Sequence, residues 1–232
     1  LADRCHEAGV RCYLMMPRIF RKEAEQYFRK QMELLTSAGF DALGIGSMEE
    51  PGFLREAGIE LPMYFDQGMY SWNHLAGAAM ERYGADRLTI PVELNEREIR
   101  DSGVQGEMIV YGYLPMMISA QCIRKTTLGC SGKPEVMWLK DRKDMRFPVV
   151  NQCRFCYNTI YNSAPLSLLG LSEQVTGLKL NAVRLNFTVE EPAAAGEILD
   201  AFFEEYGMSE KAAEPPVLRN QFTRGHFKRG VE

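Results

Sequence analysis

A local pattern repeats five times in the first half of the chain: a helical stretch ends in Gly, and a short apolar segment follows. Gly fits the left-handed residue that ends many helices, where a Cβ would be strained. Strands that alternate with helices pair in parallel through right-handed crossovers. The glycines are Gly9, Gly39, Gly58, Gly84 and Gly103, and the predicted strands behind them are residues 10–16, 40–45, 59–65, 85–90 and 107–111.

Helices are predicted between these strands, over residues 21–38, 49–57, 72–83 and 96–102. In the first of them, apolar residues recur every three or four positions, as on the buried face of a surface helix. The strands are short and nearly all apolar, which is typical of a sheet covered on both faces.

The size of the repeat sets the architecture that we expect. Five units occupy residues 1–119, whereas a closed eight-stranded barrel needs about 250 residues in all. We therefore predict an α/β fold: a partial (β/α) TIM-type barrel made of the later strands, with a Cys-rich insertion and a small C-terminal α/β segment. A five-stranded doubly wound sheet is the alternative. No G-x-G-x-x-G follows any strand, so a dinucleotide site has no support.

We predict four parts along the chain. Residues 1–119 form later βα units of the barrel, 120–165 a cysteine-rich basic segment, 166–214 a C-terminal strand–helix unit, and 215–232 a tail with few anchors. The chain begins without Met, in what reads as the middle of a helix. We expect a fragment that lacks the N-terminal barrel strands of the same protein and is inactive alone, whereas the full-length protein is an enzyme.

Composition and targeting signals exclude several classes of protein. A chain that is 46% hydrophobic and 25% charged is neither disordered nor collagen-like. Its apolar runs fall short of the roughly 18 residues that a membrane span needs, and no signal peptide opens it. We expect a cytoplasmic protein with no membrane association.

The net charge of −4 conceals a positive segment. Residues 120–160 carry three acidic groups and eight basic ones, which are Arg124, Lys125, Lys133, Lys140, Arg142, Lys143, Arg146 and Arg154. Such a patch suits RNA or a small acidic co-substrate. The alternative is a solvated loop.

The same segment holds four of the six cysteines. Cys122, Cys130, Cys153 and Cys156 are spaced C-x7-C-x22-C-x2-C. Four thiolates match tetrahedral zinc or a 4Fe-4S cluster, and the presence of one C-x2-C pair rather than two favours the cluster. A redox disulfide and four unrelated buried thiols are the other interpretations. Basic neighbours such as Arg124 would offset the charge of a cluster.

Residues beyond the predicted strands form a second candidate site. Arg18, Asp66, Glu93 and Asn95 follow the first, third and fourth strands, at the end where barrel enzymes carry their chemistry. We expect them to line a polar pocket for a small acidic co-substrate, with Glu93 alternatively capping the next helix. Arg124 and His226 are further candidates for substrate binding. The catalytic residues are not identified.

Three stretches resemble the collagenase-like peptidase family U-32. They are Glu107-Met-Ile-Val-Tyr-Gly through Cys122, Leu139 to Leu166 with its Cys153-Arg-Phe-Cys-Tyr-Asn, and Thr223-Arg-Gly-His-Phe-Lys-Arg-Gly230. The resemblance implies that Cys122, Cys130, Cys153 and Cys156 hold an oxygen-sensitive 4Fe-4S cluster, and that the protein serves oxidative hydroxylation of an RNA base or a quinone ring. Tyr111 stands before Gly112, where the strict signature has His.

Three hypotheses follow. The leading one is an iron–sulfur-dependent protein of this family that acts in the hydroxylation of RNA. The first alternative is a collagenase-like peptidase, although the chain has three histidines and no H-E-x-x-H motif. The second alternative is a zinc-stabilised structural or interaction module.

Overall fold

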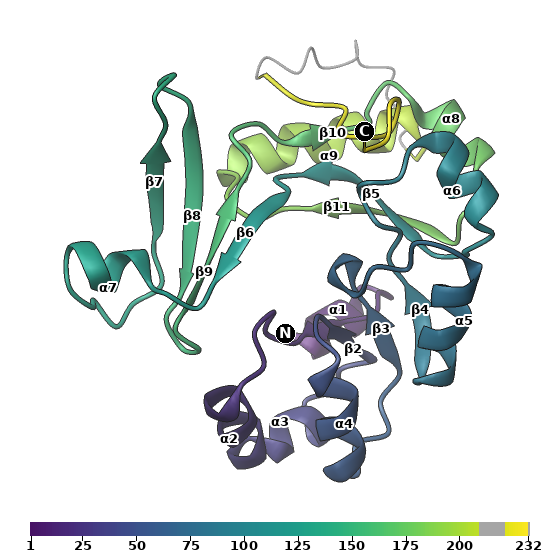
Figure 1. The fold of residues 1–232 in the computed structure, drawn as a ribbon. Helices are drawn as coiled ribbons and strands as arrows, with labels where there is room; N and C mark the ends of the chain where they lie inside the picture. The colour runs from purple at the N-terminus through teal and green to yellow at the C-terminus, as the bar shows by residue number, and fades with distance from the viewer. Residues whose placement is uncertain (209–220, 232) are drawn as a thin grey trace. The chain divides into compact units, whose positions relative to one another are not determined.

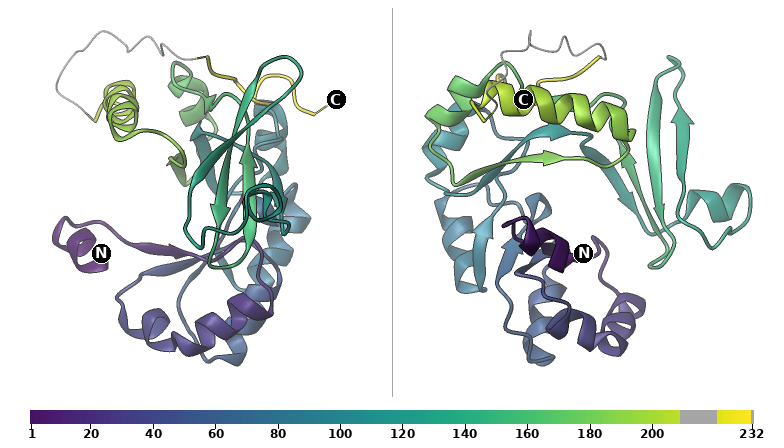
Figure 2. Two further views of the ribbon diagram at one scale, coloured as in Figure 1. Left: turned by 90° about the vertical axis from the view of Figure 1, so that its left-hand side faces the viewer. Right: turned by 180° about the vertical axis from the view of Figure 1, so that it is seen from behind.

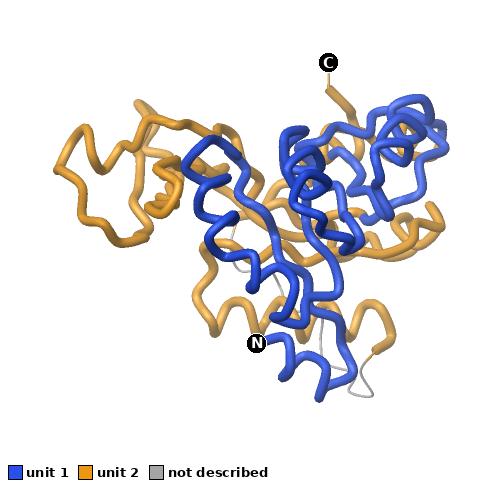
Figure 3. Tube along the Cα trace, turned by 90° about the horizontal axis from the view of Figure 1, so that it is seen from below, with its two compact units in different colours: residues 1–91, 101–107 blue, residues 92–100, 108–232 orange. Residues whose placement is uncertain are grey.

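The computed structural model describes residues 1–208 and 221–231. The chain divides into two compact units (Figure 3). Unit 1 is Leu1–Pro91 with Asp101–Glu107, and unit 2 is Val92–Arg100 with Met108–Glu232. None of the described helices has the length and apolar character needed to cross a membrane.

Unit 1 contains a parallel sheet whose strands follow the chain order (Figure 1). The strands are β1 (Tyr13–Met15), β2 (Ala42–Ile45), β3 (Met63–Phe65) and β4 (Ala85–Leu88). After β4, an isolated parallel bridge joins Thr89 to Glu107, which is the first residue of β5 (Glu107–Gly112). The order shows no reversal among the described strands, whereas a doubly wound sheet requires one.

The repeated pattern of the sequence is confirmed in unit 1. Each of the five predicted glycines has a positive φ, between 66° and 102°. The helices are α1 (Ala2–Glu7), α2 (Lys22–Lys30), α3 (Met32–Ser37), α4 (Glu49–Glu56) and α5 (His74–Arg82), with the short 3-10 helix η1 (Gln67–Met69). The next helix of the pattern, α6 (Glu96–Ser102), has residues 96–100 in unit 2. Two details differ from the prediction. The helix expected over residues 21–38 breaks at Gln31, and β4 exposes Asp86 and Arg87 instead of being apolar on both faces.

Unit 2 is built on two sheets. In the first, β5 lies between β10 (Leu166–Ser167) and β11 (Ala182–Asn186), and β10 runs antiparallel to β5. The helix α9 (Pro192–Glu205) runs along one face of this sheet, and α8 (Ser172–Gly177) lies nearby (Figure 2). Ile109, Val110 and Leu168 are at most 1% exposed and form part of the core.

The second sheet of unit 2 is antiparallel and was not predicted. Its strand order is β6 (Pro115–Ser119), β9 (Tyr157–Tyr161), β8 (Arg146–Gln152) and β7 (Val136–Lys140). The short helix α7 (Ile123–Thr127) lies between β6 and β7 in the chain. Three strands of the segment expected to be a basic insertion, β7, β8 and β9, therefore belong to this sheet, which we call the antiparallel sheet.

The predicted partial TIM-type barrel is not confirmed. The described residues form three separate sheets of four, three and four strands, and none of them closes on itself. On one side β5 pairs with β10, which runs antiparallel to it, so the parallel pairing of unit 1 does not continue through β10. What is established is a mixed α/β fold with a parallel sheet.

The C-terminal segment is better anchored than its sequence indicated. Residues 221–231 return to unit 2, where Thr223 forms a parallel bridge with Leu166. The Arg224 guanidinium donates to the carbonyl oxygens of Ser167 and Leu169, at 2.8 and 2.6 Å. Phe227 is 3% exposed. Residues 215–220 and 232 of the predicted tail lie outside the described residues.

Candidate functional site

Two of the four cysteines lie in the tight connection between β8 and β9. Gln152 and Tyr157 are the last paired residues of the two strands, so Cys153 and Cys156 lie in the loop between them. The Phe155 N–H donates to the Gln152 carbonyl at 3.1 Å, and Cys156 has a φ of 52°. This turn brings the C-x2-C pair to one end of the antiparallel sheet.

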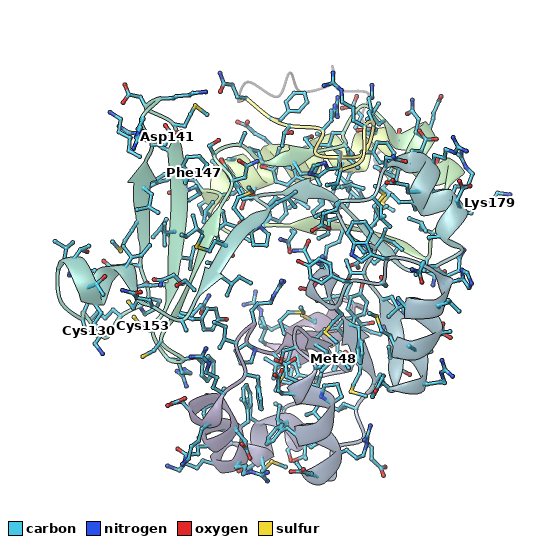
Figure 4. All side chains as sticks on the ribbon, viewed as in Figure 1. Met48, Cys130, Asp141, Phe147, Cys153 and Lys179 are labelled. Atoms are coloured by element: carbon cyan, nitrogen blue, oxygen red, sulfur yellow. The ribbon has the colours of Figure 1, made fainter. Side chains whose placement is uncertain are left out.

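The other two cysteines flank α7. Cys122 is the N-cap residue, and its Sγ accepts the backbone N–H of Lys125 at 3.5 Å. Cys130 is exposed in the loop that follows the helix. Figure 4 shows Cys130 and Cys153 near each other at one end of the sheet, with Asp141 at the other. We call the region of these four residues the cysteine end.

Two buried asparagines join the three chain segments of the cysteine end. Asn151 and Asn158 are direct cross-strand partners and are 1% and 0% exposed. The Asn158 amide donates to the Gln121 carbonyl at 2.6 Å, beside Cys122. On the other side, Asn151 accepts the N–H of Glu135 and donates to the Lys133 carbonyl at 3.5 Å. The asparagines therefore fix the segments of Cys122 and Cys130 against the turn of Cys153 and Cys156.

An ion pair closes the loop that carries Cys130. The Arg124 Nε donates to Glu135 Oε1 at 2.6 Å, and an Nη of Arg124 donates to the Gly129 carbonyl at 3.0 Å. The Ser131 hydroxyl reaches the same Glu135 oxygen at 3.3 Å. Arg124, predicted as a substrate-binding residue, thus has a structural role beside the cysteines.

The four thiols lie within electrostatic reach of one another. The pKa of Cys153 is raised, first by burial and then by negative charge on Cys130, Cys122 and Cys156. All six cysteines are free, so no disulfide competes for these sulfurs. The Cys153 Sγ donates to the Lys133 carbonyl at 2.9 Å.

The donor set fits a soft metal or an iron–sulfur cluster. Four thiols from three segments of the antiparallel region, fixed by buried amides, supply the ligands that zinc and 4Fe-4S centres use. Within residues 1–208 and 221–231, no three His, Cys, Asp or Glu side chains already stand in a liganding arrangement. Binding would therefore require the thiols to rotate, starting with Cys153, which now contacts Lys133.

The remaining cysteines belong to unit 1. Cys12 is 8% exposed, and its pKa is raised by burial and then by its contact with Cys5. His6 pairs with Asp41 at 3.0 Å, and Asp41 also accepts the Cys12 N–H at 2.7 Å. A cysteine nucleophile needs a lowered pKa, so Cys12 does not suit that role and is a core residue of unit 1.

A second polar region lies at the strand ends of unit 1. Along the chain, Arg18 follows β1, Glu50 lies in α4, which comes after β2, and Asp66 follows β3. The Arg18 Nη1 donates to Asp66 Oδ2 at 3.0 Å, and their side chains are 23% and 7% exposed. Glycines make room for this arginine, since a Cβ on Gly68 would come within 2.6 Å of its Nη2. We call Arg18, Glu50 and Asp66 the strand-end cluster.

Glu50 was missed by the sequence analysis. It is 0% exposed, and its Oε2 accepts the N–H groups of Gly46 and Ser47 at 2.7 and 3.4 Å. Its Oε1 has no hydrogen-bond partner among the described residues. Burial raises the pKa of Glu50 to about 8, although these N–H bonds act in the opposite direction. A sequence signal existed, because Glu50 comes four residues after Gly46, at the end of a strand, and a glutamate at that spacing can accept the N–H groups of the turn.

The other predicted substrate-binding residues lie in unit 2. Asn95 and Glu98 form a reciprocal cap of α6, with bonds of 2.8 and 2.9 Å, so Asn95 rather than Glu93 caps this helix. Glu93 is half-buried in the preceding turn. His226 has a local contact of 2.8 Å between Nδ1 and the Gly230 carbonyl.

Asn151 and Asn158 of the cysteine end were missed by the sequence analysis, although the sequence shows two asparagines placed symmetrically about the C-x2-C pair.

Comparisons with known proteins were made for the whole chain. The model of the family described as Peptidase family U32 matches residues 1–196. A solved structure described as "The Structure of the U32 Peptidase Mk0906" is similar, with 16% sequence identity and a TM-score of 0.38. That alignment covers 48% of this chain and 50% of the other, so this chain spans about half the length of its structural neighbour. No curated protein matches the chain significantly.

Proposed function

The chain belongs to peptidase family U32, and on this premise we propose that its four clustered cysteines hold an iron–sulfur cluster in a protein that modifies RNA oxidatively. The gathering of Cys122, Cys130, Cys153 and Cys156 at one end of one sheet carries the proposal. Cys122 and Cys153 are 31 positions apart in the chain, and they meet there because the antiparallel strands bring the chain back to the same end of the sheet.

A bound 4Fe-4S cluster would supply one-electron transfer, and the chain's own residues would hold and tune it. The N–H of Lys125 already points to the sulfur of Cys122. Such N–H bonds, together with cations such as Arg124 and Lys125, offset the negative charge of a thiolate-bound cluster and raise its reduction potential. Asn151 and Asn158 hold the ligand segments in register.

RNA as the substrate class is supported by charge. Residues 120–160 carry eight basic and three acidic groups, on a chain whose net charge is −4. Arg124 and Lys125 lie in α7 beside Cys122, whereas Lys140, Arg142, Lys143 and Arg146 lie at the opposite end of the antiparallel sheet. Both groups would neutralise phosphates. Six free thiols agree with a reducing compartment, so we also propose a cytoplasmic location.

Metal analysis of the anaerobically purified chain tests the cluster. We expect a brown protein with about four irons and matching sulfide per chain, and near-complete loss of both in Cys153→Ser. Cys5→Ser, which changes a cysteine of unit 1, is the matched control and should retain its iron. A colourless, iron-free preparation would refute the proposal. One zinc per chain would instead favour the zinc-stabilised module.

Peptidase activity is the alternative, because the family takes its name from it. It predicts cleavage of gelatin that survives replacement of all four clustered cysteines. The raised pKa of Cys12 argues against a cysteine nucleophile in unit 1. Loss of a hydroxylated RNA base in cells that lack the protein, detected by mass spectrometry of RNA, would favour the first proposal.

A further inference from the structure

The β7–β8 hairpin presents an unusual set of side chains on one face. The register pairs Val136 with Val150, Trp138 with Pro148 and Lys140 with Arg146. Directly paired residues, and residues two apart on a strand, share a face of the sheet. This face therefore carries in succession an apolar pair, the pair of Trp138 with Pro148, and a cationic pair, and we call it the Trp138 face.

Trp138 is exposed although it lies in the middle of a strand. Its relative exposure is 57%, and that of its neighbour Val136 is 49%. Indole rings are among the side chains most often covered, because they bury a large apolar area. Among the described residues no aromatic ring contacts Trp138. The ring is therefore exposed on β7, the edge strand of the four-stranded antiparallel sheet, although its direct partner Pro148 on β8 is buried.

The cationic pair beside Trp138 is unfavourable in the protein alone. Lys140 and Arg146 are direct cross-strand neighbours, and like charges in that position destabilise a sheet. Asp144 meets the Lys140 ammonium at 2.7 Å, but both side chains are more than half exposed. Asp141 uses its carboxylate on the N–H groups of Lys143 and Met145 in the turn. An anion bound between Lys140 and Arg146 would relieve their repulsion.

We propose that the Trp138 face binds single-stranded RNA, with a base stacked on Trp138 and the adjoining phosphates at Lys140 and Arg146. An aromatic platform beside cations is the chemistry with which proteins hold single-stranded nucleic acid. The inference rests on the proposed function, and it assigns RNA binding to a surface separate from the cysteines. The strand that carries Trp138 begins next to Glu135, so RNA lying along β7 runs towards the cysteine end.

The distribution of charge favours RNA over a lipid surface. The tip of the hairpin is Asp141-Arg142-Lys143-Asp144, which contains two acidic residues. A membrane-inserting hairpin would carry apolar side chains at its tip, whereas here the tryptophan lies three residues behind it. The cationic side chains equally disfavour a basic protein partner.

Tryptophan fluorescence reports directly on stacking. The chain has two tryptophans, so Trp72→Phe leaves Trp138 as the single emitter. The probe is an unstructured single-stranded RNA of about ten nucleotides. We expect the RNA to quench this emission and to bind with micromolar or tighter affinity. In Trp138→Ala the affinity should fall by about 5- to 100-fold, and Trp138→Phe should restore most of it.

Trp72→Ala is the control for loss of an exposed indole, since Trp72 is 41% exposed in unit 1. Its affinity should stay within twofold of the parent. Arg146→Gln should reduce the slope of log affinity against log salt by about 0.7, and the exposed Lys22→Gln on α2 should not. Circular dichroism confirms that each variant is folded.

The outcomes separate this inference from the proposed function. If the parent binds RNA and Trp138→Ala binds equally well, the Trp138 face is refuted while RNA modification stands. If the parent binds no RNA, both fail. Binding of the parent but not Trp138→Ala to vesicles of phosphatidylcholine and phosphatidylserine, with RNA affinity unchanged, would assign the face to lipid and overturn the inference. RNA binding that persists in iron-free Cys153→Ser would support it.

Discussion

The strand-end cluster of unit 1 and the cysteine end of unit 2 hold polar side chains in different ways. Arg18, Glu50 and Asp66 are buried or nearly so, and each follows a strand of a repeated local pattern. The cysteine end is largely exposed and depends on two buried asparagines that join distant segments. The hydrogen bonds of the first region are largely closed off from solvent, whereas those of the second hold an open region that leaves its thiols accessible.

Glycine substitutions test this difference most strongly. A Cβ on Gly106 would stand 2.5 Å from the Leu88 carbonyl oxygen, in the tightly packed sheet of unit 1. We expect Gly106→Ala to lower the free energy of unfolding by about 3 kcal/mol, measured by urea denaturation. Gly129, in the loop before Cys130, has a φ of 84° and no neighbour within 4 Å. Gly129→Ala should cost about 1 kcal/mol, from backbone strain alone. Equal costs would show that the cysteine end is packed as tightly as unit 1.

The pH dependence of stability tests the burial of Glu50. Its pKa is raised to about 8 in the folded protein, against 4.5 for an ordinary glutamate, so folding takes up a proton between these values. The contribution of protonated Glu50 to the free energy of unfolding is therefore fully present below pH 4.5 and is lost as the pH rises through about 8. Glu50→Gln mimics the protonated form.

We expect Glu50→Gln to match the parent at about pH 6 and to exceed it at about pH 9 by roughly 2 to 3 kcal/mol, measured by chemical denaturation. Glu49→Gln changes the exposed neighbour in the same helix and should show no such gain. A Glu50→Gln variant that loses stability equally at both pH values would mean that the charged carboxylate is the native form.

Local sequence patterns predicted unit 1 well and the cysteine end only in part. The five glycines that end helices mark positions where backbone strain alone selects the residue, so the strand–helix order could be read directly. Cys153 and Cys156 could be paired from their spacing. Their approach to Cys122 and Cys130 depends on the antiparallel sheet, whose pairs are set by non-local contacts that no local signal encodes.

The barrel prediction shows the same limit. The pattern of the first five units holds up to β5, and it cannot indicate that one of the two neighbours of β5 is the antiparallel β10. Burial was equally hard to foresee. Glu50 reads as a solvated charge in a run of two glutamates, and only the turn of Gly46 and Ser47 around its carboxylate covers it.

Removal of one asparagine tests how the cysteine end is held. Asn151→Ala leaves the Glu135 N–H without its partner and removes one of the donors to the Lys133 carbonyl, so we expect a loss of about 2 kcal/mol in unfolding free energy. It should also weaken iron binding, because the segment of Cys130 is released from the turn. Asn162→Ala removes only a bond to the adjacent Ser163 and is the control. Unchanged stability and iron content in Asn151→Ala would contradict the role of the asparagines.

The smallest expected effect separates backbone conformation from packing. Gly52 in α4 and Gly132 near Cys130 both have open space where a Cβ would stand. Gly52 has an ordinary helical backbone, so Gly52→Ala should stabilise the protein by about 0.5 to 1 kcal/mol. Gly132 has a φ of 67°, so Gly132→Ala should destabilise it by about 1 kcal/mol. Thermal unfolding of both variants shows whether each substitution raises or lowers the stability of the protein. The same sign in both would mean that the loop of Cys130 does not hold its backbone in the left-handed region, and that a bound metal rather than the chain itself fixes its shape.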